Sequence, residues 1–143
     1  MEKIGIIGSG TWGTAIAVLL VNNGHEVTLW SAIPAEIEEM AKTRTHRNLP
    51  GVTLPEGLIY TADLEKAMAD KDLLVMAVPS VFVRSTAQKM KPFCKDGQLI
   101  VDVAKGIEEN TLDTMTQIIK EELPMAETAV LSGPSHAEEV SRG

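Results

Sequence analysis

Short apolar segments alternate along this chain with segments that have amphipathic, helical spacing. Two of the apolar segments, "LLVMAV" and "LIVDV", are almost continuously hydrophobic. Strands with this pattern are covered on both faces, as in a parallel sheet that has helices on either side. The alternation therefore predicts an α/β fold with a doubly wound, mainly parallel sheet. We expect the strand order 3-2-1-4-5-6, with ligands outside the carboxyl ends of the strands.

The expected strands are Lys3–Ile7, Glu26–Trp30, Leu58–Thr61, Leu73–Val78, Leu99–Val103 and Thr128–Leu131. The expected helices are Thr11–Asn23, Pro34–Thr43, Asp63–Asp70, Ser80–Met90 and Thr111–Leu123. Their end signals include Pro34 in a first turn, Asp63 and Ser80 as N-caps, and Gly24 after a helix. The segment Arg44–Gly57 contains two prolines and two glycines, which predicts a long irregular connection of the kind that often carries function.

Three glycines, Gly8, Gly10 and Gly13, separate the first expected strand from the first expected helix. Their G-x-G-x-x-G spacing lies inside a strand–helix–strand unit of about thirty residues. We expect Gly8 to make the tight turn, Gly10 to let a pyrophosphate approach the backbone, and Gly13 to let the helix pack close to the sheet. Free N–H groups at the helix start would then face the anion. The fingerprint predicts a Rossmann-type dinucleotide site; a tight turn without a ligand is the alternative.

The choice between NAD and NADP depends on the end of the second strand, where an acidic residue usually binds the ribose 2′-hydroxyl. That end has the sequence "TLWSAIP", with neither an acidic nor a basic residue in the turn, and Glu26 lies at the opposite end of the strand. Arg44, His46 and Arg47 in the long connection either reach a 2′-phosphate or are solvated loop side chains. The residues leave both cofactors open.

Composition excludes several classes of partner. The net charge of −7 argues against nucleic acid and against anionic membranes, although it does not exclude a small anionic ligand. The single cysteine, Cys94, rules out an internal disulfide, and three scattered histidines have no metal-ligand spacing, so we expect no metal. The apolar stretch Ala15–Val21 is too short to span a bilayer and follows no basic leader. We therefore expect a cytoplasmic protein.

Two further motifs follow the last two expected strands, "VDVAKGIE" and "VLSGPSHAEEV". Both lie at the predicted carboxyl edge of the sheet. Lys105 would bring a positive charge there, and Gly133, Pro134 and Ser135 would form a sharp turn that caps another helix. Such a site suits a small anionic substrate, although each motif alone also fits a solvent-facing lysine or an ordinary turn.

Five motifs in one order, "GSGTWGTAIA", "NLPGVTLP", "AVPS", "KGIE" and "LSGPSHAEEV", closely resemble the bacterial NAD(P)-dependent sn-glycerol-3-phosphate dehydrogenase family along the whole chain. The resemblance implies an oxidoreductase that reversibly reduces dihydroxyacetone phosphate to sn-glycerol 3-phosphate for phospholipid synthesis. It makes residues 1–143 the N-terminal NAD(P)-binding domain and the full-length enzyme a possible homodimer. The family's general-base lysine lies in a helical C-terminal domain, so no catalytic residue is assigned here. We expect this chain to bind cofactor with little or no turnover.

The resemblance also implies residue roles. Besides the fingerprint glycines, the positions that match cofactor-binding residues are Thr11, Trp12, Phe82, Lys105 and Ala137. The positions that match substrate-binding residues are Lys105, Gly133 and Ser135. Family members often carry His or Arg where this chain has Ala32 and Ile33, which removes an expected partner of a 2′-phosphate. The alternatives are another NAD(P)-dependent dehydrogenase of the β-hydroxyacid type and a non-catalytic nucleotide-sensing module, because function belongs to the site and not to the fold.

Overall fold

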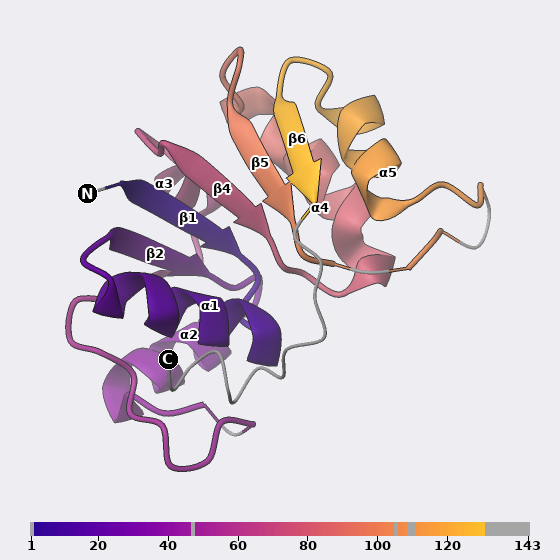
Figure 1. Ribbon diagram of the computed structural model, residues 1–143. Coiled ribbons are helices and arrows are strands. Elements are labelled where there is room, and N and C mark those ends of the chain that lie inside the picture. Colours follow the sequence, from indigo (N-terminus) through magenta and orange to yellow (C-terminus); the bar gives the residue numbers. More distant parts are fainter. Residues whose placement is uncertain (1, 47, 105, 109–110, 131–143) are drawn as a thin grey trace.

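The structure is a computed structural model, and it describes residues 2–46, 48–104, 106–108 and 111–130 (Figure 1). In chain order the elements are β1 (Lys3–Ile7), α1 (Thr11–Asn22), β2 (Glu26–Trp30), α2 (Pro34–Thr43), β3 (Ile59–Thr61), α3 (Leu64–Met68), β4 (Leu73–Met76), η1 (Ser80–Phe82), α4 (Val83–Met90), η2 (Lys91–Phe93), β5 (Leu99–Asp102), α5 (Met115–Glu122) and β6 (Glu127–Val130). Strands and helices alternate throughout, as the sequence predicts.

The sheet has six strands in the order β3-β2-β1-β4-β5-β6, and every neighbouring pair is parallel. The predicted fold class and strand order are therefore confirmed. The chain builds outward from β1 to β3 and then returns to place β4 on the other side of β1. In this register Ile6 lies opposite both Leu29 of β2 and Val75 of β4. The carboxyl ends of β1 and β4 thus form the switch point at which ligands bind in such sheets.

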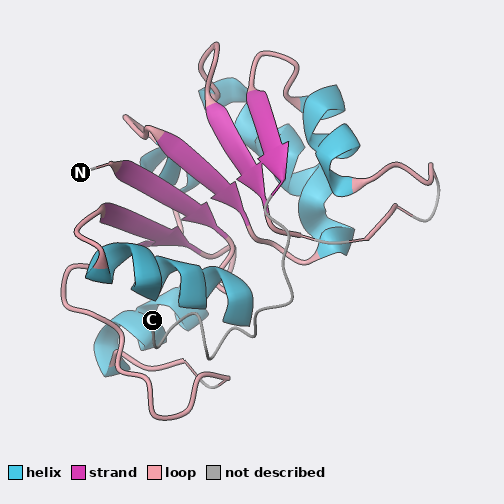
Figure 2. Ribbon diagram, in the orientation of Figure 1, coloured by secondary structure: helices cyan, strands magenta, loops and turns pink. Residues whose placement is uncertain are grey.

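Helices cover both faces of the sheet, with α1 and α2 on one side and α3, α4 and α5 on the other (Figure 2). Alternate side chains of β1 serve the two layers, because successive residues of a strand point to opposite faces. Ile4 and Ile6 belong to the cluster that includes Ile16 of α1 and Ile37 of α2. Ile7 belongs to the opposite cluster, which contains buried side chains of α3, α4 and α5. The sheet is therefore held between two hydrophobic layers.

The local signals for helix ends are partly confirmed. The Asp63 carboxylate accepts hydrogen bonds from the N–H groups of Glu65 and Lys66, at 3.0 and 3.4 Å, as an N-cap does. Gly24, just beyond α1, has the φ of +90° that suits a glycine after a helix. Ser80 does not cap a helix with its side chain. It begins the short η1, and α4 starts only at Val83.

The helix predicted over Thr111–Leu123 is shorter, since α5 begins at Met115. Leu112 has a φ of +61°, a left-handed conformation that a right-handed helix excludes. Thr114 forms a capping box with Gln117 and so sets the start of the helix. The fourth and fifth strands are also shorter than predicted, by two residues and one residue, because β4 ends at Met76 and β5 at Asp102. Leu131, the predicted end of the last strand, lies outside the described residues.

The segment between α2 and β3 is irregular, as expected, but it is packed. Leu49 and Leu54 are almost fully buried, and the Leu54 N–H donates to the Arg44 carbonyl at 2.7 Å. The loop is therefore packed in place through these buried side chains.

Within the described ranges, none of the helices has both the length and the apolar character that a membrane crossing needs.

Candidate functional site

The glycine-rich turn between β1 and α1 has the geometry that its spacing predicts. Gly8 has a φ of +125°, and a Cβ there would lie 2.6 Å from the carbonyl carbon of Ala77 and the nitrogen of Val78. A Cβ on Gly13 would collide with the Gly8 carbonyl oxygen. A side chain at either position is thus excluded by backbone, which brings α1 close to the ends of β1 and β4.

Gly10 differs from its two neighbours, because a Cβ there would meet no atom of the described chain within 4 Å. It is the N-cap of α1, and its carbonyl accepts the Thr14 N–H at 2.9 Å. Among the described residues, no side chain caps this helix start, whereas Asp63 and Thr114 cap α3 and α5. The first N–H groups of α1 therefore face open space, which is the arrangement that binds an anion.

The long loop supports this turn through His46. The Ser9 carbonyl accepts from Thr14 Oγ1 and from His46 Nε2, each at 3.0 Å, and His46 Nδ1 accepts the Asn48 N–H at 3.1 Å. These partners require the neutral tautomer with hydrogen on Nε2. His46 is only 9% exposed, so it is a buried support of the turn and not the solvated loop side chain that we considered.

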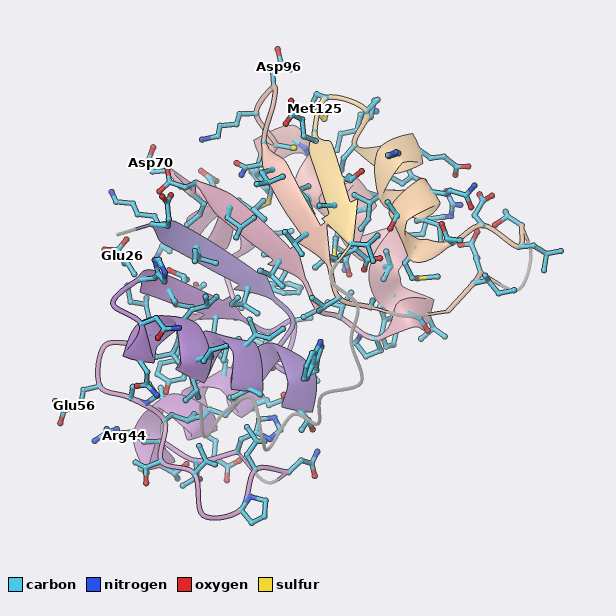
Figure 3. All side chains as sticks on the ribbon, viewed as in Figure 1. Glu26, Arg44, Glu56, Asp70, Asp96 and Met125 are labelled. Carbon is cyan, nitrogen blue, oxygen red and sulfur yellow. The ribbon has the colours of Figure 1, made fainter. Side chains whose placement is uncertain are left out.

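Arg44, the other loop residue considered for a phosphate, is directed elsewhere. Its Nε donates to the Leu54 carbonyl at 3.0 Å, and its guanidinium lies 3.6 Å from the Glu56 carboxylate. Figure 3 shows both labelled side chains at the lower left of the molecule, away from the arrowheads that mark the carboxyl ends of the strands. Arg44 is thus a solvated loop cation. Arg47 lies outside the described residues.

Two hollows adjoin the glycine-rich turn. The first, here called the edge hollow, has a volume of about 410 Å³ and lies between the turn, Ile33 after β2, and Phe82 and Lys89 of η1 and α4. The second, the loop hollow, has about 540 Å³ and lies between α2 and the long loop, with His46 in its wall. Gly10 and Glu36 line both hollows. The two hollows thus meet the turn at the same two residues.

The edge hollow has two exposed apolar side chains in its lining. Ile33 and Phe82 line it and are 56% and 54% exposed, so both offer apolar surface to a bound group. Because an aromatic base stacks well on apolar and aromatic surfaces, this part of the hollow suits the adenine of a nucleotide. The sequence identified Phe82 through its family resemblance alone, and the structure places it beside the fingerprint.

A carboxylate that the sequence analysis passed over lies at the same turn. Ser9 Oγ donates to Glu36 Oε1 at 2.9 Å, and Ser9 is 5% exposed. Glu36 is in the first turn of α2, where the helix dipole favours a negative charge. Its position about twenty residues beyond the last fingerprint glycine was the available signal. The search of the turn directly after β2 could not find it.

The end of β5 prepares the segment that contains Lys105. Asp102 is 3% exposed, accepts the Ala104 N–H at 2.9 Å and accepts the Thr116 hydroxyl at 3.3 Å. Burial raises the pKa of Asp102, and the two hydrogen bonds oppose that effect. This carboxylate therefore shapes the backbone that leads to Lys105, which itself lies outside the described residues.

Arg84 of α4 organises the chain beyond Lys105. Its guanidinium binds Glu108 through two hydrogen bonds of 2.8 and 2.9 Å and also contacts Glu121 and Glu122 of α5, at 2.9 and 2.7 Å. The Arg84 hydrogen bonds lower the pKa of the Glu108 carboxyl, with a smaller contribution from the Thr111 hydroxyl. These acidic side chains therefore form an ion-pair network around Arg84 and not a freely solvated helix face.

The remaining predicted site residues divide into two groups. Thr11 and Trp12 open α1, and the partly buried Trp12 packs against the core cluster beneath α1 and α2. Lys105, Gly133, Ser135 and Ala137 lie outside the described residues, so their roles stay predictions. The described site is therefore the half that would hold the adenosine and pyrophosphate of a dinucleotide.

A doubly wound parallel sheet with an open, glycine-lined helix start at its switch point defines the class of Rossmann-type α/β domains. Within this class, the model of the family described as "NAD-dependent glycerol-3-phosphate dehydrogenase N-terminus" matches residues 3–143. The chain belongs to that family, and the resemblance drawn from its motifs is confirmed.

Individual relatives agree. A glycerol-3-phosphate dehydrogenase (NAD(P)+) of Agathobacter rectalis is 54% identical over 143 residues, covering 99% of this chain and 43% of that protein. One from Fusobacterium nucleatum is 52% identical over 146 residues, covering 100% of this chain and 44% of that protein. The crystal structure of the Coxiella burnetii glycerol-3-phosphate dehydrogenase superposes with a TM-score of 0.91 at 31% identity, over 99% of this chain and 43% of that one. The chain thus spans less than half the length of these relatives.

Proposed function

We propose that residues 1–143 form the N-terminal NAD(P)-binding domain of a glycerol-3-phosphate dehydrogenase. The enzyme would reversibly reduce dihydroxyacetone phosphate to sn-glycerol 3-phosphate in the cytoplasm and so supply glycerophospholipid synthesis. The observation that carries the proposal is the uncapped start of α1 at Gly10, which opens onto the edge hollow. The family membership supplies the reaction.

The described residues fit a dinucleotide. The N–H groups at the start of α1 would bind the pyrophosphate, and Ile33 and Phe82 would enclose the adenine. Thr11 and Trp12 follow Gly10 directly and would complete the phosphate cradle. When bound, the nicotinamide supplies the hydride, and the protein supplies position and charge.

The substrate half of the site remains a proposal from the family. Lys105 would contact both cofactor and substrate, Gly133 and Ser135 the phosphorylated substrate, and Ala137 the cofactor. The general-base lysine would lie in a helical C-terminal domain of the full-length enzyme, which is a possible homodimer. We therefore expect this chain alone to bind cofactor with little or no turnover.

Titration of the chain with NADH, followed by nicotinamide fluorescence, tests the cofactor site. Gly10→Val should abolish binding, because the new side chain would occupy the open space where the pyrophosphate lies. Circular dichroism should stay native, since a Cβ at Gly10 meets no described atom within 4 Å. Ala41→Val on the exposed side of α2 is the matched control and should bind as the wild type does. Unchanged affinity in Gly10→Val would refute the proposal.

Substitution of Lys105 in a full-length enzyme tests the reaction. Lys105→Ala should strongly reduce the consumption of NADH or NADPH with dihydroxyacetone phosphate, measured by nicotinamide absorbance. A variant that keeps full turnover would argue against this role of Lys105. Coenzyme binding without any turnover in the full-length wild type would instead indicate a nucleotide-sensing module.

A further inference from the structure

We propose that Glu36, held in place by Ser9, makes this domain prefer NADH to NADPH. The inference rests on the proposed cofactor site and specifies which adenosine ribose that site accepts. Family membership leaves the choice open, since the relatives carry both cofactors in their names. The Ser9–Glu36 contact places a carboxylate where it would distinguish NADH from NADPH.

The location of Glu36 is the first part of the argument. A dinucleotide that places its pyrophosphate over Gly10 and its adenine between Ile33 and Phe82 has its adenosine ribose between these points. Glu36 lines this stretch and, together with Gly10, is shared by the edge hollow and the loop hollow. In sheets of this kind an acidic side chain at that place accepts the 2′-hydroxyl and excludes a 2′-phosphate. Here the carboxylate comes from the first turn of α2 and not from the end of β2.

The state of the carboxylate is the second part. The Ser9 hydroxyl donates a hydrogen bond to Glu36 Oε1 at 2.9 Å. The other carboxylate oxygen, Oε2, has no hydrogen-bond partner within the described ranges. A carboxylate offers about four acceptor sites, so it can take a ribose hydroxyl while it keeps the serine. None of the ion pairs in the described part of the chain involves Glu36. As far as the described residues go, its negative charge is therefore available to repel a phosphate.

The surrounding charges are the third part. Glu39, one helical turn further along α2, also lines the loop hollow and adds a second carboxylate. His46 faces the same hollow in its neutral form, with both ring nitrogens already engaged. Lys89 of α4 lines the edge hollow, on an exposed turn of the helix beyond Phe82. A 2′-phosphate beside Glu36 would therefore be repelled by the carboxylates of Glu36 and Glu39, and attraction by the exposed Lys89 would not offset this repulsion.

The expected selectivity follows from Coulomb's law. A 2′-phosphate carries between one and two negative charges at neutral pH, and at about 4 Å from a carboxylate each unit costs a several-fold loss of affinity even at high dielectric. We expect NADPH to bind at least about ten-fold more weakly than NADH. Because surface charges are screened by salt, the ratio should decrease as ionic strength rises.

The experiment compares the dissociation constants of NADH and NADPH by fluorescence titration at low salt. It uses the wild-type chain and four variants: Glu36→Gln, Ser9→Ala, Glu38→Gln and Lys89→Gln. Glu36→Gln should bring the two constants to within about three-fold of each other. Ser9→Ala should reduce the ratio in part, because it frees the carboxylate from its fixed position. Glu38→Gln, with the same charge change on an exposed position of α2, should leave the ratio as in the wild type. Circular dichroism verifies that each variant is folded.

Adenosine-half probes locate the effect. ADP-ribose and its 2′-phosphorylated counterpart lack the nicotinamide, so their ratio of affinities reports on the ribose next to Glu36 alone, and it should follow the coenzyme ratio. Equal binding of NADH and NADPH to the wild type, or a ratio that changes in Lys89→Gln but not in Glu36→Gln, would overturn this inference and leave the proposed function intact. Binding of neither coenzyme would overturn the proposed function itself.

Discussion

Replacement of Gly13 by alanine tests the close contact between α1 and the sheet, because two opposing effects meet at this position. Alanine in a helix interior is favoured over glycine by about 1 kcal/mol. At Gly13, however, the new methyl group would collide with the Gly8 carbonyl oxygen and lie 3.0 Å from the Ala77 Cβ. The first obstacle is backbone, so it cannot be relieved by a side-chain rotation.

The structure decides the sign of the result. Overpacking against fixed neighbours costs about 1–3 kcal/mol, which exceeds the propensity gain in most of that range. We expect Gly13→Ala to lower the free energy of unfolding by up to about 2 kcal/mol. For a chain of this size about 1 kcal/mol corresponds to roughly 3 °C in Tm, so the melting temperature should fall by several degrees.

Thermal and urea denaturation followed by circular dichroism measure the effect. Ala35→Gly in the first turn of α2 is a useful reference, because it makes the reverse change at an exposed helical position and reports the local propensity alone. An equal or higher stability of Gly13→Ala would show that α1 can shift freely, and the close approach that aims its N–H groups would not be a constraint.

Two further predictions concern the supports of the site. His46→Ala should lower the free energy of unfolding by about 1–3 kcal/mol and weaken NADH binding, because the Ser9 carbonyl of the glycine-rich turn and the Asn48 N–H of the loop each lose a hydrogen bond. Urea unfolding and coenzyme titration measure the two effects, and no change in either would mean that the loop does not support the turn. Arg84→Met should lower Tm at pH 7. Because the folded pKa of Glu108 is lowered, its stabilisation is present above the unfolded pKa and is lost as pH falls through the folded pKa. The Tm difference should therefore shrink in acid, and a difference independent of pH would contradict this role of the ion pairs.

Much of the fold could be predicted from short stretches of sequence. β1, β2 and α2 have the predicted bounds, because apolar runs, Pro34 and the glycine spacing act on neighbouring residues. The errors occur where a local signal competes with another one nearby. The start of α5 is an example, since the left-handed Leu112 and the capping box of Thr114 exclude the earlier turn.

The residues alone predicted the part of the candidate site whose chemistry belongs to the backbone, and the family resemblance added Phe82. The fingerprint glycines act through the absence of a side chain, and that property depends on their spacing in one turn. The partners of this turn come from elsewhere: Ser9 meets Glu36 over 27 positions and His46 over 37 positions of sequence. No local pattern contains such a pair.

The sequence by itself determined the alternation of strands and helices, the parallel sheet order and the family, because these follow from periodicity and from motifs within single segments. Only the tertiary structure decided that the Glu36 carboxylate lies at the glycine-rich turn and that a buried histidine supports this turn. The physical reason is that hydrogen bonds and charge interactions act over a few ångströms in space. Helix α2 and the long loop bring those groups to the turn only when the chain is folded.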